Sequence, residues 1–354
     1  MRKGEMDLAK KDIAVVSAYI ELTSKCNMTC RHCYNDSGVA GKSFIEPEEF
    51  TKMLLKLRQL HCEQIILSGG EPLIHPEICN YITRASSLGI RDISVITNGL
   101  IFYDEFARVC RQNGVTVVIS MDGPDKFSYS LFRKEENFQR VQDHVIQYAQ
   151  NCEVEINMVL SKRNYMVIED MAKFAVENGI KKINLLNLNC TGRAVNFYEV
   201  AALDNRELEE CRSNICKAVK AYPEVQFLGA VNPIVVNTCR YLIPTGNPEY
   251  HVRIDSKGDL FLCSAATKAT GNLLLQEPDE FRSALNGAVT SEMRKQFVKL
   301  YSDCRTCEVH TVCRKGCPLS FTEKKQMRAY CEDCRAGYRK ILGQQISIKM
   351  ENMV

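Results

Sequence analysis

Strand-like and helix-like segments alternate from residue 15 to about residue 190, and this alternation constrains the fold more than any other feature of the chain. The strand-like segments are rich in Val and Ile and almost continuously apolar, as parallel strands buried on both faces are. They cover residues 15–22, 64–68, 92–97, 115–121, 154–160 and 182–188. Such β/α units predict a parallel sheet with helices outside, and they are too few for a closed eight-unit barrel. We therefore predict an α/β fold built on an open, partial (β/α)6 parallel barrel.

Helix-like segments fill the intervals between these strands. The first begins at Pro47 and places Phe50, Leu54 and Leu57 on one face, as an amphipathic helix requires. The expected helices cover residues 47–61, 76–88, 104–113, 138–150, 165–178 and, as a bridge, 204–221. After this bridge, Lys257 and Gly258 predict a hairpin turn between short strands at residues 251–255 and 260–262.

The expected organisation has five parts. They are an N-terminal extension, the partial barrel, a bridging region, a small cysteine-rich α+β domain and a tail, over residues 1–14, 15–200, 201–236, 237–343 and 344–354.

The chain contains 18 cysteines, and eleven of them are grouped near its two ends. In a chain without an export signal, close groups of cysteines indicate metal ligation rather than disulfides. The remaining cysteines stand alone in helix-like or strand-like segments, where we expect small buried thiols. These are Cys62, Cys79, Cys110, Cys152, Cys190, Cys211 and Cys216.

The N-terminal group is Cys26, Cys30 and Cys33, spaced C-x3-C-x2-C directly after the first expected strand. Loops at the C-terminal ends of parallel strands are where such folds place their chemistry. Three thiolates can hold three irons of a [4Fe–4S] cube and leave the fourth iron open to a small chelating ligand. The alternative is a zinc knuckle, whose nearby fourth ligand would be His32. That residue lies between two of the cysteines, so simultaneous ligation would be strained.

This spacing in a β/α chain resembles the radical S-adenosylmethionine (SAM) superfamily, and the resemblance covers about residues 15–195. In that family the fourth iron is chelated by the amine and carboxylate of SAM. One-electron reduction cleaves SAM to methionine and a 5′-deoxyadenosyl radical, which takes a hydrogen atom from the substrate. The resemblance therefore implies an enzyme with a [4Fe–4S] cluster and SAM as cofactors.

Further segments resemble the strand ends that contact SAM in this family. Residues 68–72 match its GGEP segment, in which glycines allow close approach and Glu71 can accept a hydrogen bond from an ammonium. Asn98 lies in a T-N-G segment, while Ser120 and Asp122 lie in a segment similar to S-L-D-G-P. Taken alone, each segment is more often a plain turn. A G-R-A segment at residues 192–194 also resembles relatives, and no role is assigned to it.

Two more features complete the expected SAM contacts. Arg133 is placed to clamp the SAM carboxylate, although a solvated arginine is an equally ordinary alternative. His32 occupies the position where the family usually has an aromatic ring against adenine. The full set of expected contacts is His32, Tyr34, Ser68, Gly69, Gly70, Glu71, Pro72, Asn98, Ser120, Asp122 and Arg133.

The C-terminal cysteines resemble the SPASM domain over roughly residues 237–340, and the run C-x2-C-x5-C-x3-C matches it residue for residue. Eight thiolates are the right number for two further cubes, which makes three [4Fe–4S] clusters in all. A zinc ribbon would leave the first two of these cysteines unexplained. The eight are Cys239, Cys263, Cys304, Cys307, Cys313, Cys317, Cys331 and Cys334.

The resemblance divides these eight cysteines between two auxiliary clusters. The gap from Cys239 to Gly258 is longer than the family pattern allows, so the fourth ligand of auxiliary cluster I stays open. This fourth ligand is either one of Cys331 and Cys334, or the iron has no protein ligand at that position. Auxiliary cluster II would take Cys304, Cys307, Cys313 and one of Cys331 and Cys334, and auxiliary cluster I would take Cys239, Cys263 and Cys317.

SPASM proteins of this kind act mostly on polypeptides, so the resemblance implies a peptide substrate and an oxidative cross-link in a ribosomally made precursor. Formylglycine-forming sulfatase maturases carry an Asp where this chain has Ser264, which disfavours that alternative. A tetrapyrrole-modifying enzyme is a further alternative. A non-enzymatic iron–sulfur carrier would need no SAM pocket, so the strand-end motifs argue against it. The family also implies an electron donor such as flavodoxin or ferredoxin.

Charge and hydropathy add expectations about partners and location. The net charge of +3 is too weak to indicate nucleic acid as the partner. The apolar stretch at residues 13–16 is far too short to span a membrane, and no signal-peptide pattern precedes it. We therefore expect a cytoplasmic protein. Because the chain reaches Cys26 so early, we expect any leader-peptide recognition to need a separate protein or another surface.

Overall fold

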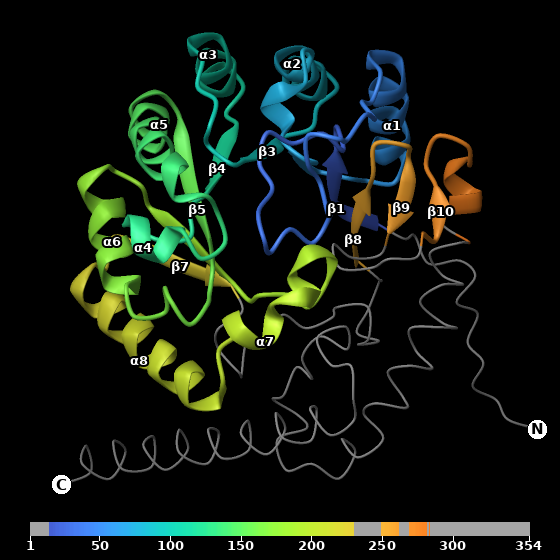
Figure 1. Cartoon of the computed structure of the whole chain (residues 1–354). Coiled ribbons are helices and arrows are strands. Elements are labelled where there is room, and N and C mark those ends of the chain that lie inside the picture. Colours follow the sequence, from blue (N-terminus) through green and yellow to red (C-terminus); the bar gives the residue numbers. More distant parts are fainter. Residues whose placement is uncertain (1–13, 230–248, 262–268, 282, 284–354) are drawn as a thin grey trace, which may run out of the picture.

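A computed structural model describes residues 14–229, 249–261, 269–281 and 283 (Figure 1). Its described strands form one sheet in the order β10-β9-β8-β1-β2-β3-β4-β5-β6-β7. The strands are β1 (Ala14–Glu21), β2 (Gln64–Ser68), β3 (Asp92–Thr97), β4 (Thr116–Ser120), β5 (Glu153–Val159), β6 (Lys182–Leu186), β7 (Gln226–Gly229), β8 (Glu249–Ile254), β9 (Asp259–Phe261) and β10 (Gly271–Asn272).

Helices follow the strands as the alternating pattern predicts, and Figure 1 shows them arranged in an arc along one side of the sheet. They are α1 (Pro47–Gln59), α2 (Ile78–Ser87), α3 (Asp104–Gln112), α4 (Lys126–Tyr129), α5 (Phe138–Asn151), α6 (Ile168–Glu177), α7 (Tyr198–Ala201) and α8 (Asn205–Ala221), with the 3-10 helices η2 (Pro72–Ile74), η3 (Glu135–Asn137) and η4 (Gly192–Asn196). In the described part of the chain, no helix is both long and apolar enough to cross a membrane.

The predicted parallel α/β core is confirmed. Strands β1 to β6 lie side by side in sequence order, and each pairs in parallel with the next. Their bounds agree with the predicted ones to within two residues, because the apolar runs that marked them are the buried cores of the strands. The C-terminal ends of these strands therefore meet along one edge of the sheet.

Two parallel strands extend this core beyond the predicted set. On one side, β7 pairs with β6, although its segment lay in the expected bridging region. On the other side, β8 pairs in parallel with β1 and then turns through the predicted hairpin into antiparallel β9. The hairpin was predicted, but its place in the sheet was not, because its partner strand lies more than 200 residues earlier.

Buried and half-buried positions alternate in β2, β3, β5 and β6, so the expectation of burial on both faces was wrong for these strands. By contrast, β1 and β4 have buried residues on both faces. Ile65 and Leu67 are fully buried in the main core together with residues of α1 and α2. The alternate positions, such as Asn157 and Asn184, are only half-buried and polar. We call this second face, which points away from the main core, the inner face. Partly exposed polar positions on this face are what an open barrel leads us to expect.

A buried ion pair on the inner face joins β1 to β8. The guanidinium of Arg253 lies 3.1 Å from the carboxylate of Glu21, and both residues are less than a tenth exposed. The same guanidinium lies 3.8 Å from the centre of the Phe261 ring. Burial raises the pKa of Glu21, and the charge of Arg253 opposes that rise. This pair therefore fixes the edge of the parallel core at the strand that precedes the cysteine-bearing loop.

We predict an asymmetric response to breaking this pair. Arg253→Met leaves a buried carboxylate without its cation and should lower the free energy of unfolding by about 3–5 kcal/mol. Adding Glu21→Gln removes the stranded charge, so the double variant should regain part of that loss. The measurement is denaturant-induced unfolding. Lys134→Met, at an exposed ion pair with Glu136, is the control and should change little. Additive losses in the double variant would contradict the prediction.

Candidate active site

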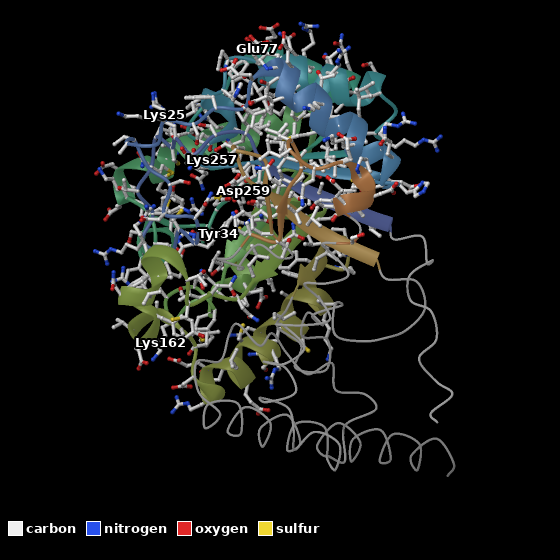
Figure 2. The ribbon with its side chains drawn as sticks, turned by 90° about the vertical axis from the view of Figure 1, so that its right-hand side faces the viewer. Lys25, Tyr34, Glu77, Lys162, Lys257 and Asp259 are labelled. Atoms are coloured by element: carbon white, nitrogen blue, oxygen red, sulfur yellow. The ribbon has the colours of Figure 1, made fainter. Side chains whose placement is uncertain are left out.

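The predicted N-terminal cysteines lie in one loop at the C-terminal end of β1. We call residues 22–46 the cysteine loop. Isolated bridges join Thr23 to Phe44 and Lys25 to Gly38, so the loop folds back on itself. The Cys26 N–H donates to the Gly38 carbonyl at 3.0 Å. Figure 2 shows Lys25 and Tyr34 of this loop on the same side of the molecule as Lys257 and Asp259 of the β8–β9 hairpin.

The two glycines of the GGEP segment contact the backbone of this loop. The Gly70 N–H donates to the Thr23 carbonyl at 2.6 Å, and the Glu71 N–H donates to the Lys25 carbonyl at 2.9 Å. A Cβ atom at Gly70 would collide with the Lys25 carbonyl, and one at Gly69, whose φ is +134°, would collide with that of Thr23. The sequence predicted close approach by a ligand here, and the structure shows that the loop's own backbone makes this approach.

The carboxylate of Glu71 is buried and hydrogen-bonded by the fold itself. It accepts from the Thr97 hydroxyl and the Asn98 N–H, each at 2.8 Å, and from the Leu73 N–H at 3.1 Å. Burial raises the pKa of Glu71 to about 7, and these hydrogen bonds oppose the rise. Glu71 thus connects the end of β2 to the end of β3. The predicted contact with an ammonium can use only the carboxylate lone pairs that these three donors leave free.

Asn98 connects the end of β3 to the cysteine loop. Its side-chain nitrogen lies 2.7 Å from Asn27 Oδ1 and 3.8 Å from the sulfur of Cys26. The Met28 N–H also points at this sulfur, at 3.4 Å. The sulfur of Cys26 therefore has two neutral donors before any metal is considered.

Arg133 is neither solvated nor free, so the solvated alternative was wrong. Its Nε donates to the Asp122 carboxylate at 2.6 Å, and Asp122 is fully buried. Its Nη1 lies 3.6 Å from the sulfur of Cys30. Burial lowers the pKa of Arg133, but the charge and hydrogen bond of Asp122, together with nearby Cys30 and Tyr129, more than offset this, so the net direction is upward. The end of β4 thus holds a cation against the second cysteine.

His32 lies beside the same group, with its ring centre 4.5 Å from that of Phe132. Burial lowers its pKa to about 4, so the imidazole is neutral at pH 7. Its Nδ1 is buried, and no hydrogen-bond partner for it lies among the described residues. An unpaired buried nitrogen is costly, which makes this atom a place where a bound molecule would gain a hydrogen bond.

The remaining predicted residues occupy the same region in different ways. The Tyr34 hydroxyl donates to Glu21 at 3.2 Å, and the Ser68 hydroxyl pairs with the hydroxyl of Tyr19 at 2.7 Å. Pro72 begins the 3-10 helix η2 and is buried. Ser120 is half-buried at the last position of β4. The structure thus brings the predicted strand ends together around one loop.

The donor set of the cysteine loop suits an iron–sulfur cluster. N–H groups and a guanidinium lie next to the sulfurs of Cys26 and Cys30, and hydrogen bonds to sulfur stabilise such clusters. Burial raises the pKa of Cys26 to about 12, so its thiol stays protonated until a metal displaces the proton. Across the described residues, no three His, Cys, Asp or Glu side chains gather tightly enough for a single metal ion.

The C-terminal cysteine group falls outside the described residues. It comprises Cys239, Cys263, Cys304, Cys307, Cys313, Cys317, Cys331 and Cys334. Their ligation stays a prediction.

Sequence reasoning missed several residues that shape this site. Asn164 donates to the Asp122 carbonyl at 2.7 Å and so fixes the end of β4 from the loop after β5. Arg193, in the segment to which no role was assigned, contacts the cysteine loop directly. The G-R-A pattern was the available signal for Arg193. Asn164 lies four residues beyond the predicted end of the fifth strand, and that position alone gives no sign of its contact.

Comparison with known proteins places the chain in a family. The family model described as the radical SAM superfamily matches residues 20–185. A probable GTP 3',8-cyclase of Pyrococcus horikoshii is 32% identical over 214 residues, which cover 58% of this chain and 67% of that protein. The corresponding protein of Methanothermobacter thermautotrophicus is 28% identical over 52% of this chain, which spans only 62% of its length. The chain belongs to the radical SAM superfamily, and this membership implies a [4Fe–4S] cluster and SAM.

Further matches have names or titles that mention maturation or peptides. The sporulation killing factor maturation protein SkfB of Bacillus subtilis is 25% identical over 54% of this chain and 47% of the length of SkfB. SuiB of Streptococcus suis, bound to the precursor peptide SuiA, superimposes with a TM-score of 0.68 at 16% identity, over 88% of this chain and 75% of SuiB. The protein anSMEcpe with bound AdoMet superimposes with a TM-score of 0.68 at 16% identity, over 94% of this chain and 98% of anSMEcpe. At these identities the two structures support the fold alone.

The glycine contact gives a test of how the cysteine loop is held. Gly70→Ala would force the loop backbone away from β2, because its Cβ has no room beside the Lys25 carbonyl. We expect it to lower thermal stability and to lower the iron retained after anaerobic reconstitution by up to about four irons per chain, the content of one cluster. Gly38→Ala in the same loop is the matched control, since its Cβ would lie 3.7 Å from Thr29 Cγ2. Equal iron content in both variants would show that the contact is dispensable.

Proposed function

We propose that this radical SAM enzyme abstracts a hydrogen atom from a residue of a peptide and forms an oxidative cross-link in it. The observation that carries the radical chemistry in this proposal is the cysteine loop, which holds a C-x3-C-x2-C group against the ends of β2, β3 and β4. A cluster bound there with SAM would supply the one-electron cleavage that generates a 5′-deoxyadenosyl radical. The residues described above would bind, orient and shield these groups.

We infer that Cys26, Cys30 and Cys33 are the cluster ligands. Arg133 would lie within reach of both the cluster and the SAM carboxylate, held in place by Asp122. His32 offers a neutral ring with an unpaired Nδ1 to the adenine. The other proposed SAM contacts are Tyr34, Ser68, Gly69, Gly70, Glu71, Pro72, Asn98, Ser120 and Asp122.

For the C-terminal region we propose two auxiliary [4Fe–4S] clusters held by its eight grouped cysteines. Removing one hydrogen atom, and then one electron and one proton as the new bond forms, oxidises the substrate by two electrons. An auxiliary cluster is a suitable acceptor for the second electron. An external donor such as flavodoxin or ferredoxin would reduce the first cluster. We further propose a cytoplasmic enzyme and a separate leader-binding protein, with neither nucleic acid nor membrane as a partner.

The peptide substrate is supported by relatives of two kinds. SuiB is seen with a precursor peptide, and other structures of anSMEcpe contain a bound peptide. SkfB is named as a maturation protein. Ser264, in place of the Asp expected in formylglycine formation, favours a cross-link over that product.

A second candidate function is a small-molecule reaction on GTP. It is favoured by identities of 28% and 32% with proteins named as probable GTP 3',8-cyclases, which exceed those to the peptide-binding structures. Those identities cover 52% and 58% of this chain. The peptide proposal therefore rests on the C-terminal cysteine pattern and is separable from the radical chemistry.

The cofactor assignment predicts which cysteines are essential. The reconstituted chain should contain about twelve irons, and replacing Cys26, Cys30 and Cys33 together by Ala should leave about eight. That variant should produce no 5′-deoxyadenosine when SAM and a strong reductant are supplied under anaerobic conditions. The matched control replaces Cys79, Cys152 and Cys216, which lie outside the loop, and should still cleave SAM. SAM cleavage by the loop variant would refute the assignment.

The substrate is tested by anaerobic co-expression with short peptides encoded near its gene, followed by mass spectrometry. We expect a product two mass units lighter per event, with the change mapped to a new side-chain bond. The purified enzyme is incubated in parallel with GTP and SAM. Consumption of GTP with no change in any peptide would select the second candidate and leave the radical SAM chemistry intact.

A further inference from the structure

Arg193, just after β6, reaches across to the cysteine loop. Its Nε donates to the Cys30 carbonyl at 2.8 Å, and its Nη1 donates to the Ser37 carbonyl at 2.8 Å. The same Nη1 lies 2.7 Å from the carboxylate of Asp36. Its own N–H donates to the Cys33 carbonyl at 3.0 Å. One residue therefore binds the main chain at three points between Cys30 and Ser37.

The neighbouring glycine makes this contact possible. Gly192 has a φ of +57°, and a Cβ there would collide with the carbonyls of Cys33 and Tyr34. The backbone of η4 thus lies directly on the backbone of the cysteine loop, with no side chain between them. Asp36 is 73% exposed, so its ion pair with Arg193 adds little, and the carbonyl contacts are the ones that hold the loop.

We propose that Arg193 is a positioning residue that holds the turn from Cys30 to Cys33 in the shape needed to bind iron. The proposal rests on the assignment of these cysteines as cluster ligands. The planar guanidinium presents several donors in fixed directions, so it can bond the Cys30 and Ser37 carbonyls together. Its positive charge also lies near a group of sulfurs that become anionic on binding metal.

The segment that carries Arg193 is itself held in place by packing and hydrogen bonds. The Phe197 ring packs edge-on against Phe132 at 5.8 Å between centres. The Lys162 N–H donates to the Ala201 carbonyl at 3.0 Å, which ties the end of α7 to the loop after β5. The cysteine loop is thus supported on its β6 side by a packed segment, residues 192–201, rather than by a lone side chain.

The test compares Arg193→Ala, Arg193→Lys and the control Arg163→Ala in the full-length reconstituted chain. Arg163 lies in the loop after β5, 4.9 Å from the centre of the Phe127 ring, and makes no contact with the cysteine loop among the interactions described. Two readouts are followed: the rate of iron release to a chelator, and the fraction of the reduced cluster signal in electron paramagnetic resonance that shifts when SAM is added.

We expect Arg193→Ala to release iron from this cluster about tenfold faster than the wild type, as loss of charge-assisted hydrogen bonds implies. The SAM-responsive signal should fall in proportion. Arg193→Lys should be intermediate, because one ammonium keeps the charge but cannot bond both carbonyls. Arg163→Ala should match the wild type.

Wild-type release rates in both Arg193 variants would overturn the proposal. If Arg193→Ala fails to fold, Arg193→Lys decides by the same readouts. A wild-type chain that holds no SAM-responsive cluster would refute the proposed function instead, so the two failures are distinguishable.

Discussion

The site depends on one backbone-to-backbone contact, between Gly69–Gly70 after β2 and Thr23–Cys26 after β1. Two N–H groups of the GGEP segment bond the Thr23 and Lys25 carbonyls, and neither glycine has room for a Cβ. The position of Cys26 is therefore fixed by the main chain of the neighbouring strand. Side-chain contacts are easily lost by substitution, whereas this contact needs only that nothing be added.

Polar groups at the ends of successive strands then hold one another in place around the cysteine loop. Glu71 binds the end of β3, Asn98 reaches from there to Cys26, and Arg133 is held by Asp122 against Cys30. Each of these groups is buried, where an unpaired partner would be costly. The same network that aligns the strands therefore also places donors and a cation beside two of the three sulfurs.

The sequence predicted the parallel core and the cysteine-bearing loop after the first strand, because both are marked by local patterns of a few adjacent residues. It could not predict the pairing of β8 with β1, which depends on residues more than 200 positions apart. Nor could it predict β7, whose four residues include a glycine and carry too little apolar signal. The position of Arg133 gave no choice between a solvated and a bound guanidinium, since the choice is made by Asp122 in three dimensions.

The pairing of β8 with β1 has a consequence for how the chain is made. Ser17 and His251 are hydrogen-bonded neighbours, yet they lie 234 positions apart in the sequence. At a synthesis rate of about 5–20 residues per second, β1 leaves the ribosome on the order of 10–50 s before β8 does. During that interval the outer edge of β1 is a strand without its neighbour, open to pairing with other chains. The first strand of this enzyme is thus among the last to be completed, and nascent chains are at risk of mispairing at the strand that leads to the cysteine loop.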